Sequence, residues 1–415
     1  MNKIISHCYQ QASGVVQCQV VEKGRVVRSY EPQKNLILNQ GLNTVCSSVV
    51  WGDAFLHCAA GTGTTATNAA SGAGENGSGA STTFTGPGSF NFTSNAAVGD
   101  MLKMSSGSSS GTEVRITAVT DATHVEYIPS GTLSSGEFTI YKTSQVGLAT
   151  EVKRHSVYLT GSGNCGSSVS GSSCVLKRTF DFSAESGGVT YNEVGFSWTS
   201  TPGNNLFSRI KLSSGVPLIA GQQFRVIYTL TIAVSPTTLT PATFNITGWP
   251  VLPSTSLDGD QQWQLPGIIG IATDGTYQQS DAGGSYGTGC LEPCIVDTAS
   301  GLYSCYIWIS PNASAPTSFN TAAVDRTANS AHQIVTLSSY VALDFFRDKS
   351  TTFAVGAANR TDFRSMGLGT YRFGSSVYPE STGCAFVCVF DEAQTKSSLY
   401  TLTLSFRIHV GRTLA

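Results

Sequence analysis

Apolar and polar residues alternate along most of this chain, in short runs separated by Gly, Ser, Thr and Asn. The first clear run places Val16, Cys18 and Val20 on one face of an extended segment. Gly24 follows at a turn, and residues 26–27 resume the apolar pattern. Two runs with a period of two residues around a glycine turn predict a β-hairpin. Similar runs recur to the C-terminus, so the sequence predicts an all-β protein.

One stretch departs from this period. Leu42, Val45 and Val49 recur at the spacing of one helix face, and Asn39 stands where a helix N-cap is expected. We therefore expect one short amphipathic helix over residues 39–51. It is expected to be the only sizeable helix in the first half of the chain.

Two strand-like segments in the two halves of the chain are near copies of each other. The shared string is Tyr-Thr-Leu-Thr, within FRVIYTLTI in the first copy and LYTLTLSFRI in the second. Its tyrosines, Tyr228 and Tyr400, lie 172 residues apart (400 minus 228), and so do Gly195 and Gly367. Equal spacing of two landmarks favours a tandem duplication of one β domain over chance similarity between Thr-rich strings.

Residues 83–141 read as five closely spaced short strands without a counterpart in the second half, which predicts a small β-barrel-like module inserted into the first domain. The stretch before it, residues 61–80, has no large apolar residue and predicts a surface loop. In the second half, strands are expected at 267–271, 303–309, 332–337, 340–346 and 385–390. The predicted units are a first β-sandwich domain (1–80 and 144–235), the inserted β module (81–143), a proline-containing linker (236–242) and a second, related jelly-roll-like β-sandwich domain (243–415).

Composition narrows the classes of function. With 415 residues the chain is long enough for two or three domains, yet only 12% of them are charged. A surface so poor in charge is expected to be covered by other copies of the chain or by partners. The net charge of −2 comes without a basic run, which argues against nucleic-acid binding. The chain also lacks the long apolar stretch of a membrane helix and the apolar segment of a secretory signal, so we expect synthesis in a cytoplasm without export by that route.

The cysteine spacing does not indicate a metal site. Their number, 11, is odd, so at least one has no partner within the chain. Cys384 and Cys388 fall on the same side of a predicted strand about 13 Å apart, and the spacing of Cys290, Cys294 and Cys305 does not fit a zinc knuckle. Most cysteines are expected to be buried thiols, and we predict no metal site. Cys165 and Cys174 flank a Ser/Gly loop and are a possible disulfide under oxidising conditions.

We find no catalytic motif. The six histidines are isolated, without a His-x-x-x-His or Gly-x-Ser-x-Gly arrangement. Asp258-Gly259-Asp260 and Asp274-Gly275 lack the other ligands of a calcium loop and are expected to be turns. The carboxylate pair of a glycoside hydrolase meets in space rather than in sequence, so the sequence leaves that chemistry open. We expect no enzyme activity and no cofactor.

Aromatic residues give the one candidate binding site. Trp249, Trp263, Tyr277 and Tyr286 lie among Gly, Gln, Asp and Ser, together with Tyr303, a mixture that can form a glycan-binding face. The alternative, which we favour, is that these rings pack beneath long loops.

Both ends of the chain resemble structural proteins of tailed bacteriophages. Residues 26–42 contain a strand, an Asn-Leu-hydrophobic run and a Gly-Leu helix start, and Ala-Gly-Thr-Gly-Thr-Thr follows at 60–65. Asn205–Arg209 is similar to theirs, and so is the C-terminal part with FDEAQTK at 390–396, the final strand and Gly411-Arg412. The resemblance implies a virion component of the tail or its tip, and it transfers no catalytic residue.

The resemblance and the composition together give a functional expectation. We expect a structural tail-tip, baseplate or fibre-attachment protein that forms a homo-oligomeric ring or trimer and contributes to host attachment, located in the virion tail and assembled in the host cytoplasm. Its expected partners are other copies of itself, other tail proteins and a host surface glycan or protein receptor, without nucleic acid and without membrane insertion. Alternatives are a glycan-binding host-recognition protein, a glycan depolymerase, and a head decoration or collar protein.

Overall fold

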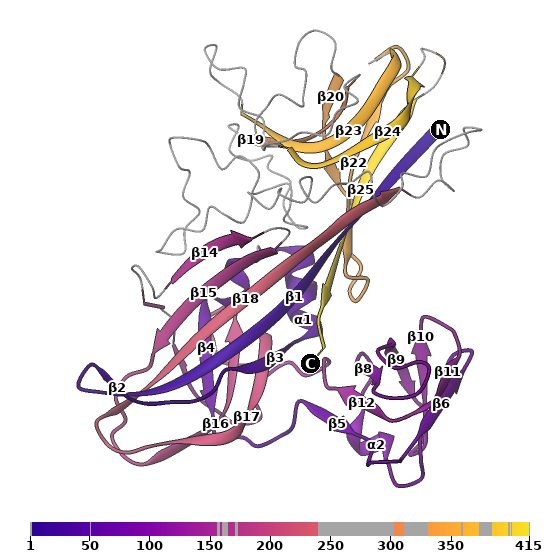
Figure 1. The fold of residues 1–415 in the computed structure, drawn as a ribbon. Helices are drawn as coiled ribbons and strands as arrows, with labels where there is room; N and C mark the ends of the chain where they lie inside the picture. The colour runs from indigo at the N-terminus through magenta and orange to yellow at the C-terminus, as the bar shows by residue number, and fades with distance from the viewer. Residues whose placement is uncertain are drawn as a thin grey trace.

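The structure is a computed structural model and is predominantly β (Figure 1). Strands account for 54% of it and helices for 6%, which confirms the predicted all-β class. The described residues are 2–49, 51–155, 158–159, 165–170, 173–239, 303–310, 331–357, 360–372, 384–396, 399 and 401–414.

A 13-stranded sheet forms the body of the molecule. Its main path runs through nine strands, in the order β13 (Glu151–His155), β4 (His57–Gly61), β16 (Val189–Ser197), β17 (Leu206–Leu218), β3 (Gln33–Ile37), β1 (Asn2–Glu22), β18 (Gln222–Leu239), β15 (Ser173–Asp181) and β14 (Cys165–Ser170). In Figure 1, β1, β18 and β15 cross in front of β4, β16 and β17. Because β3 pairs with both β1 and β17, it joins these two layers at one side.

The N-terminal hairpin predicted from the alternating pattern is present. β1 pairs antiparallel with β2 (Arg25–Ser29), and Gly24 makes the turn with φ of 77°, a conformation that suits glycine. Val16, Cys18 and Val20 are all buried, as their period of two predicted.

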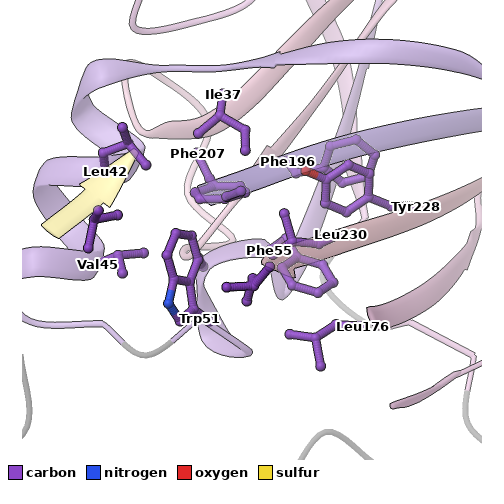
Figure 2. Packing of buried hydrophobic residues seen from close by; sticks show 14 of the residues in the cluster. Ile37, Leu42, Val45, Trp51, Phe55, Leu176, Phe196, Phe207, Tyr228 and Leu230 are labelled. Carbon is purple, nitrogen blue, oxygen red and sulfur yellow. The ribbon is translucent and has the colours of Figure 1, made fainter. Parts of the chain in front are cut away.

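Aromatic side chains fill the space between the two layers. Figure 2 shows Trp51, Phe55 and Phe207 converging with Tyr228 and Phe196. The rings of Phe196 and Tyr228 stack with centroids 3.9 Å apart, and Trp51 meets Phe207 edge to face at 6.2 Å. Trp51 follows the short helix α1 (Asn39–Ser47), and Phe55 ends the 3-10 turn η1 (Asp53–Phe55). These contacts make the interior of the first half a close-packed aromatic core.

The predicted helix is confirmed as α1, with Leu42 and Val45 buried against the core, but it ends at Ser47 rather than at residue 51, so Val49 lies outside it. The expected capping role of Asn39 is wrong. Leu38 occupies the N-cap position, without a side-chain cap, because the Asn39 side chain makes tertiary hydrogen bonds instead.

The second half of the chain repeats the strand pairing of the first. Its seven described strands are β19 (Tyr303–Ser310), β20 (Ala331–Ile334), β21 (Thr336–Leu337), β22 (Phe346–Phe353), β23 (Arg360–Arg372), β24 (Cys384–Lys396) and β25 (Leu402–Arg412). In the first half β4 pairs with β13 and β16, and in the second β19 pairs with β20 and β23. The pairs β16–β17, β14–β15 and β15–β18 recur as β23–β24, β21–β22 and β22–β25. All ten pairs are antiparallel, and equivalent strands follow the same chain order.

An ion pair marks equivalent places in the two halves. Asp181 on β15 accepts two hydrogen bonds from Arg225 on β18, at 2.6 and 2.7 Å. Asp348 on β22 accepts two from Arg407 on β25, at 2.7 and 2.8 Å. The two arginines are 182 residues apart (407 minus 225), whereas the two tyrosines of the shared string are 172 residues apart. The equivalent positions in the structure therefore have a different offset from the one that the sequence string indicates. The predicted last strand also starts too early, because β25 begins at Leu402.

One strand belongs to both halves. The first part of β1, Asn2–Ala12, runs parallel to β25, while β1 pairs antiparallel with β18 from Ser6 to Glu22. Tyr9, for example, lies between Ser235 on one side and His409 on the other. The apolar core accordingly continues from one half into the other as a single cluster.

A separate eight-stranded sheet is built between residues 68 and 141, which we call the module. Its strands are β5 (Asn68–Ala70), β6 (Gly77–Ala80), β7 (Thr83–Thr85), β8 (Met101–Met104), β9 (Glu113–Val119), β10 (His124–Ile128), β11 (Leu133–Gly136) and β12 (Phe138–Tyr141), with the one-turn helix α2 (Phe92–Asn95). The module has its own core, in which the rings of Phe84, Phe90 and Phe92 surround Phe138 at 4.9 to 5.7 Å. It begins earlier in the chain than the predicted boundary at residue 81.

The surface loop predicted at 61–80 is wrong in part, because β5 and β6 lie within it. The reason is that small residues are required where aromatic rings close over the backbone. A Cβ on Gly77 would lie 2.5 Å from the ring of Phe84, and one on Gly79 would lie 2.7 Å from the hydroxyl of Tyr127. The absence of large side chains therefore reflects packing rather than a loop.

Two further expectations need correction. The strand predicted at 340–346 is wrong, because Leu343 and Phe345 have φ of 72° and 54° and regular pairing starts only at Phe346. β18 continues to Leu239, so residues 236–239 of the predicted linker are strand. The strand predicted at 267–271 lies outside the described residues.

We expect the buried thiols of the first half to be unreactive. Cys18 and Cys58 are free and buried, and desolvation raises the pKa of Cys18 to about 12 and that of Cys58 well above its usual value. Since the thiolate is the nucleophile, iodoacetamide at pH 8 should leave both unmodified in the folded protein and alkylate both in denaturant. Peptide mass spectrometry measures this, with the denatured sample as the control. Rapid modification of either thiol in the folded protein would show that it is not buried.

Candidate functional site

The aromatic residues expected to form a glycan-binding face, Trp249, Trp263, Tyr277 and Tyr286, lie outside the described residues. That expectation therefore stays a prediction. Cys290 and Cys294 lie outside as well. Cys165 is opposite Arg178 in the β14–β15 ladder and Cys174 is opposite Val169, so the backbone register does not place these two cysteines opposite each other.

An extensive polar site lies where the module joins the body. Two connections, residues 62–67 and 142–150, lead from the body to the module and back. They run side by side, since the Thr62 amide donates to the Thr150 carbonyl at 3.0 Å and the Lys142 amide donates to the Thr67 carbonyl at 2.8 Å. Backbone hydrogen bonds therefore hold the two connections together at the base of the module.

A buried ion pair holds both connections to the body. Glu193 on β16 and Arg209 on β17 form a salt bridge of 2.8 Å, with side chains 0% and 2% exposed. Glu193 also accepts hydrogen bonds from the amides of Gly63, Ala149 and Thr150, at 3.1, 3.0 and 2.7 Å. Each carboxylate oxygen thus has two donors, which is the condition for burying a charge without a large penalty.

Arg209 extends the same arrangement. Its guanidinium donates to the Gln145 side chain at 2.7 Å and to the Thr65 carbonyl at 2.9 Å, so it touches both connections. Glycine is required at position 63, because a Cβ there would lie 2.3 Å from the Glu193 carboxylate. The Gly-Thr-Gly stretch noted in the sequence is therefore the segment that this buried carboxylate holds.

A second set of contacts joins helix α1, the module and the connection that leads back to the body. Asn39 donates its amide N–H to the Thr143 carbonyl at 2.8 Å and its side-chain NH₂ to the Gly99 carbonyl at 2.7 Å. Asp100 accepts from the Ser144 amide at 2.9 Å and from the Ser144 hydroxyl at 2.6 Å. Desolvation raises the pKa of Asp100, and these hydrogen bonds act in the opposite direction.

The C-terminal strand reaches the same place. Arg412 on β25 is buried and donates to the Ile37 carbonyl at 2.6 Å and to the Asn39 side-chain oxygen. Burial lowers the pKa of Arg412, with the carboxylates of Glu113 and Asp100 acting against that shift. Helix α1, the module and the second half therefore meet around one buried cation.

Two direct hydrogen bonds join the module to the second half. Arg115 on β9 donates to the Leu343 carbonyl at 2.7 Å, and Lys103 on β8 donates to the Leu414 carbonyl at 3.2 Å. Residues 338–345 also hold α1, because Tyr340 and the Leu343 amide both donate to the Asn43 side chain, at 2.6 and 2.9 Å. These side-chain requirements explain the irregular backbone where a strand was expected. We call Asn39, Asn43, Arg115, Leu343 and Arg412 the three-way junction.

The arrangement holds chain segments in position. Glu193 has all its acceptor positions occupied and no exposed surface, so it cannot reach a substrate as an acid or base. Sequence analysis missed this pair. The available signal was a glutamate and an arginine within apolar strands, between Tyr191 and Val194 and between Phe207 and Ile210.

One His–Asp–Thr cluster resembles a catalytic triad in composition only. His124 Nδ1 lies 2.9 Å from Asp121 and 3.0 Å from the Thr123 hydroxyl. Both partners meet the same ring nitrogen, so the imidazole cannot relay a proton from the hydroxyl to the carboxylate. Hydrogen bonds from the Thr123 amide and His124 lower the pKa of Asp121 to about 2. The cluster is a turn between β9 and β10 with an ionised carboxylate.

An aromatic row crosses β1, β25 and β22, where the two halves meet. Tyr9 stacks on His409 with ring centroids 4.5 Å apart, and Phe346 lies 5.6 Å from His409 on the other side. The Arg407 guanidinium covers the ring of Phe346 at 4.1 Å. Because faces of these rings already contact other side chains, the row is better suited to stabilising the sheet than to stacking against a sugar.

Within the described residues, no three His, Cys, Asp or Glu side chains gather as metal ligands would, and no helix is long and apolar enough to cross a membrane. No family model, curated protein or solved structure matches this chain.

Proposed function

We propose that this chain is a structural component of a tailed-phage virion, at the tail tip, baseplate or fibre attachment, that assembles with other copies of itself and with other tail proteins. The observation that carries the proposal is the way the module is held. The buried Glu193–Arg209 pair fixes both of its connections, and the three-way junction fixes it to α1 and to the second half. Such an arrangement ties the module to the body and to the second half at several places, which favours a mechanical subunit.

The shared strand supports the same proposal. Because β1 pairs with β18 and with β25, pulling one half away from the other would break a continuous ladder. The apolar cluster that runs through both halves would have to open as well. Together with the phage-like sequence segments and the low share of charged residues, this favours an assembly subunit.

We also propose that the two halves are duplicated jelly-roll-like sandwiches and that the module was inserted into the first. The five matching strand pairs and the two equivalent Asp–Arg pairs support a duplication. The separate sheet and separate core of the module support an insertion.

The test is the location and the oligomeric state of the protein. An antibody against the module should label the tail of intact particles in electron microscopy, and native mass spectrometry of the purified full chain should give a single homo-oligomer. An antibody against a known capsid protein of the same particle is the control. Labelling of the capsid would contradict the tail assignment, and a protein that stays monomeric at high concentration would contradict the assembly role.

A further inference from the structure

One end of the body carries apolar and basic side chains on an exposed strand. All five residues of β2 are exposed, and Val26 and Val27 are 46% and 53% exposed. Ile219, in the turn between β17 and β18, is 65% exposed. This turn lies at the same end, because Arg25 of β2 and Gln222 of β18 both pair with Glu22 of β1. We call Arg25, Val26, Val27, Arg28 and Ile219 the basic tip.

The charge of this end is opposite in sign to that of the chain as a whole. Residues 22–34 contain four basic and two acidic side chains, whereas the whole chain has a net charge of −2. Exposed apolar side chains ringed by charge are typical of a protein interface. Two such tips carry charge of the same sign and would repel each other, so a contact between two copies of the tip is not favoured.

The module has the complementary charge. Residues 68–141 contain six acidic and two basic side chains. On strand β10, Glu126 and Ile128 alternate with the buried Val125 and Tyr127, so they share the outer face, and Ile128 is 38% exposed. Asp121 is exposed in the adjoining turn and ionised at neutral pH. We call Asp121, Glu126 and Ile128 the acidic face.

The two surfaces lie apart, on the two sides of the molecule in Figure 1. In Figure 1, β2 is at the far left and β10 is at the right, with the body between them. One copy therefore cannot bring its own tip and acidic face together. A contact between the tip of one copy and the acidic face of the next is heterologous, and repeated contacts of this kind close a ring or extend a filament.

We propose that the basic tip of one copy of this chain docks on the acidic face of a second copy, with Arg25 and Arg28 opposite Asp121 and Glu126 and with the exposed valines and Ile219 against Ile128. The inference rests on the proposed function as a self-assembling subunit. It adds which surfaces make the contact and that the contact is head to tail. A contact that pairs exposed charges weakens with salt, because the screening length is about 10 Å at 0.1 M ionic strength.

The experiment measures the mass of the full-length protein by sedimentation velocity over a range of concentrations at low salt and at 0.5 M salt. The variants are Arg25→Glu/Arg28→Glu at the tip, Glu126→Lys at the acidic face, and the triple variant that combines them. Lys211→Glu is the control, since Lys211 is exposed on β17 outside both surfaces. Asp121 is left unchanged because its carboxylate holds the β9–β10 turn.

The tip variant and Glu126→Lys should each raise the concentration needed for assembly by roughly tenfold or more. High salt should raise it for the unchanged protein as well. The control Lys211→Glu should leave it unchanged. The triple variant should recover part of the loss, because its reversed charges again attract. Near-ultraviolet circular dichroism checks folding, and recovery by the triple variant answers the question even if one parent is less stable. Assembly unchanged in both parents, or no recovery in the triple variant, would overturn the proposed contact while leaving self-assembly intact. An unchanged protein that is monomeric throughout would overturn the proposed function too.

Discussion

Replacing Glu193 by alanine is expected to lower the free energy of unfolding by about 3–5 kcal/mol. The substitution leaves the Arg209 guanidinium buried without its carboxylate and removes the acceptor of three backbone N–H groups, on Gly63, Ala149 and Thr150. A buried charge that loses its partner is among the most costly changes a protein can undergo. Urea unfolding followed by circular dichroism measures the change.

Two variants make this test specific. Glu31→Ala removes an exposed carboxylate and should stay within about 0.5 kcal/mol of the unchanged protein. The double variant Glu193→Ala/Arg209→Ala should lose less than the sum of the two single losses, because the second change removes the charge that the first left unpaired. Limited proteolysis should also cut residues 62–67 and 142–150 faster in Glu193→Ala. A loss below 1 kcal/mol with unchanged proteolysis would show that the pair does not hold the module.

Replacing Trp51 by alanine is expected to cost about 3–5 kcal/mol as well, for a different reason. Trp51 is fully buried against Phe207, and its indole N–H donates to the buried Gln10 side chain at 2.9 Å. Alanine leaves a large cavity between the two layers and removes this donor from Gln10.

The comparison with milder changes distinguishes packing from hydrogen bonding. Trp51→Phe keeps a ring in the cavity and loses the N–H, so it should cost less than the alanine variant. Val355→Ala, at a side chain that is 59% exposed, is the control and should change stability by no more than about 0.5 kcal/mol. Thermal and urea unfolding of the three variants provide the measurement. Equal losses for Trp51→Phe and Trp51→Ala would place the effect in the hydrogen bond rather than in the cavity.

The sequence predicted the elements whose signal is local. Alternation places Val16, Cys18 and Val20 inside, and helical spacing places Leu42 and Val45 inside, because each pattern follows from the geometry of a single element. It could not predict how Asn39 is used. A side chain that suits an N-cap bonds here to Gly99 and Arg412, residues that approach it only through the tertiary fold.

The same limit applies to the candidate site. The sequence predicts a loop from Gly61 onwards, whereas the structure places Gly61 and Gly63 against the carboxylate of Glu193 on β16. Their small size is a requirement of that approach, and composition alone cannot separate it from flexibility. The irregular backbone at Leu343 and Phe345 is likewise set by contacts with Asn43 and Arg115, which overrule a local preference for strand.

The parallel ladder between β1 and β25 joins residues that are 400 positions apart in the chain, since Asn2 lies opposite Leu402. During synthesis, β1 can pair with β18 from Ser6 onwards once residue 239 has left the ribosome, whereas the other edge of Asn2–Ala12 has no partner strand until residues 402–412 emerge. An open strand edge is available throughout that interval for pairing with another nascent chain. Translation speed and chaperone occupancy over the second half should therefore govern the yield of native protein more than they do over the first.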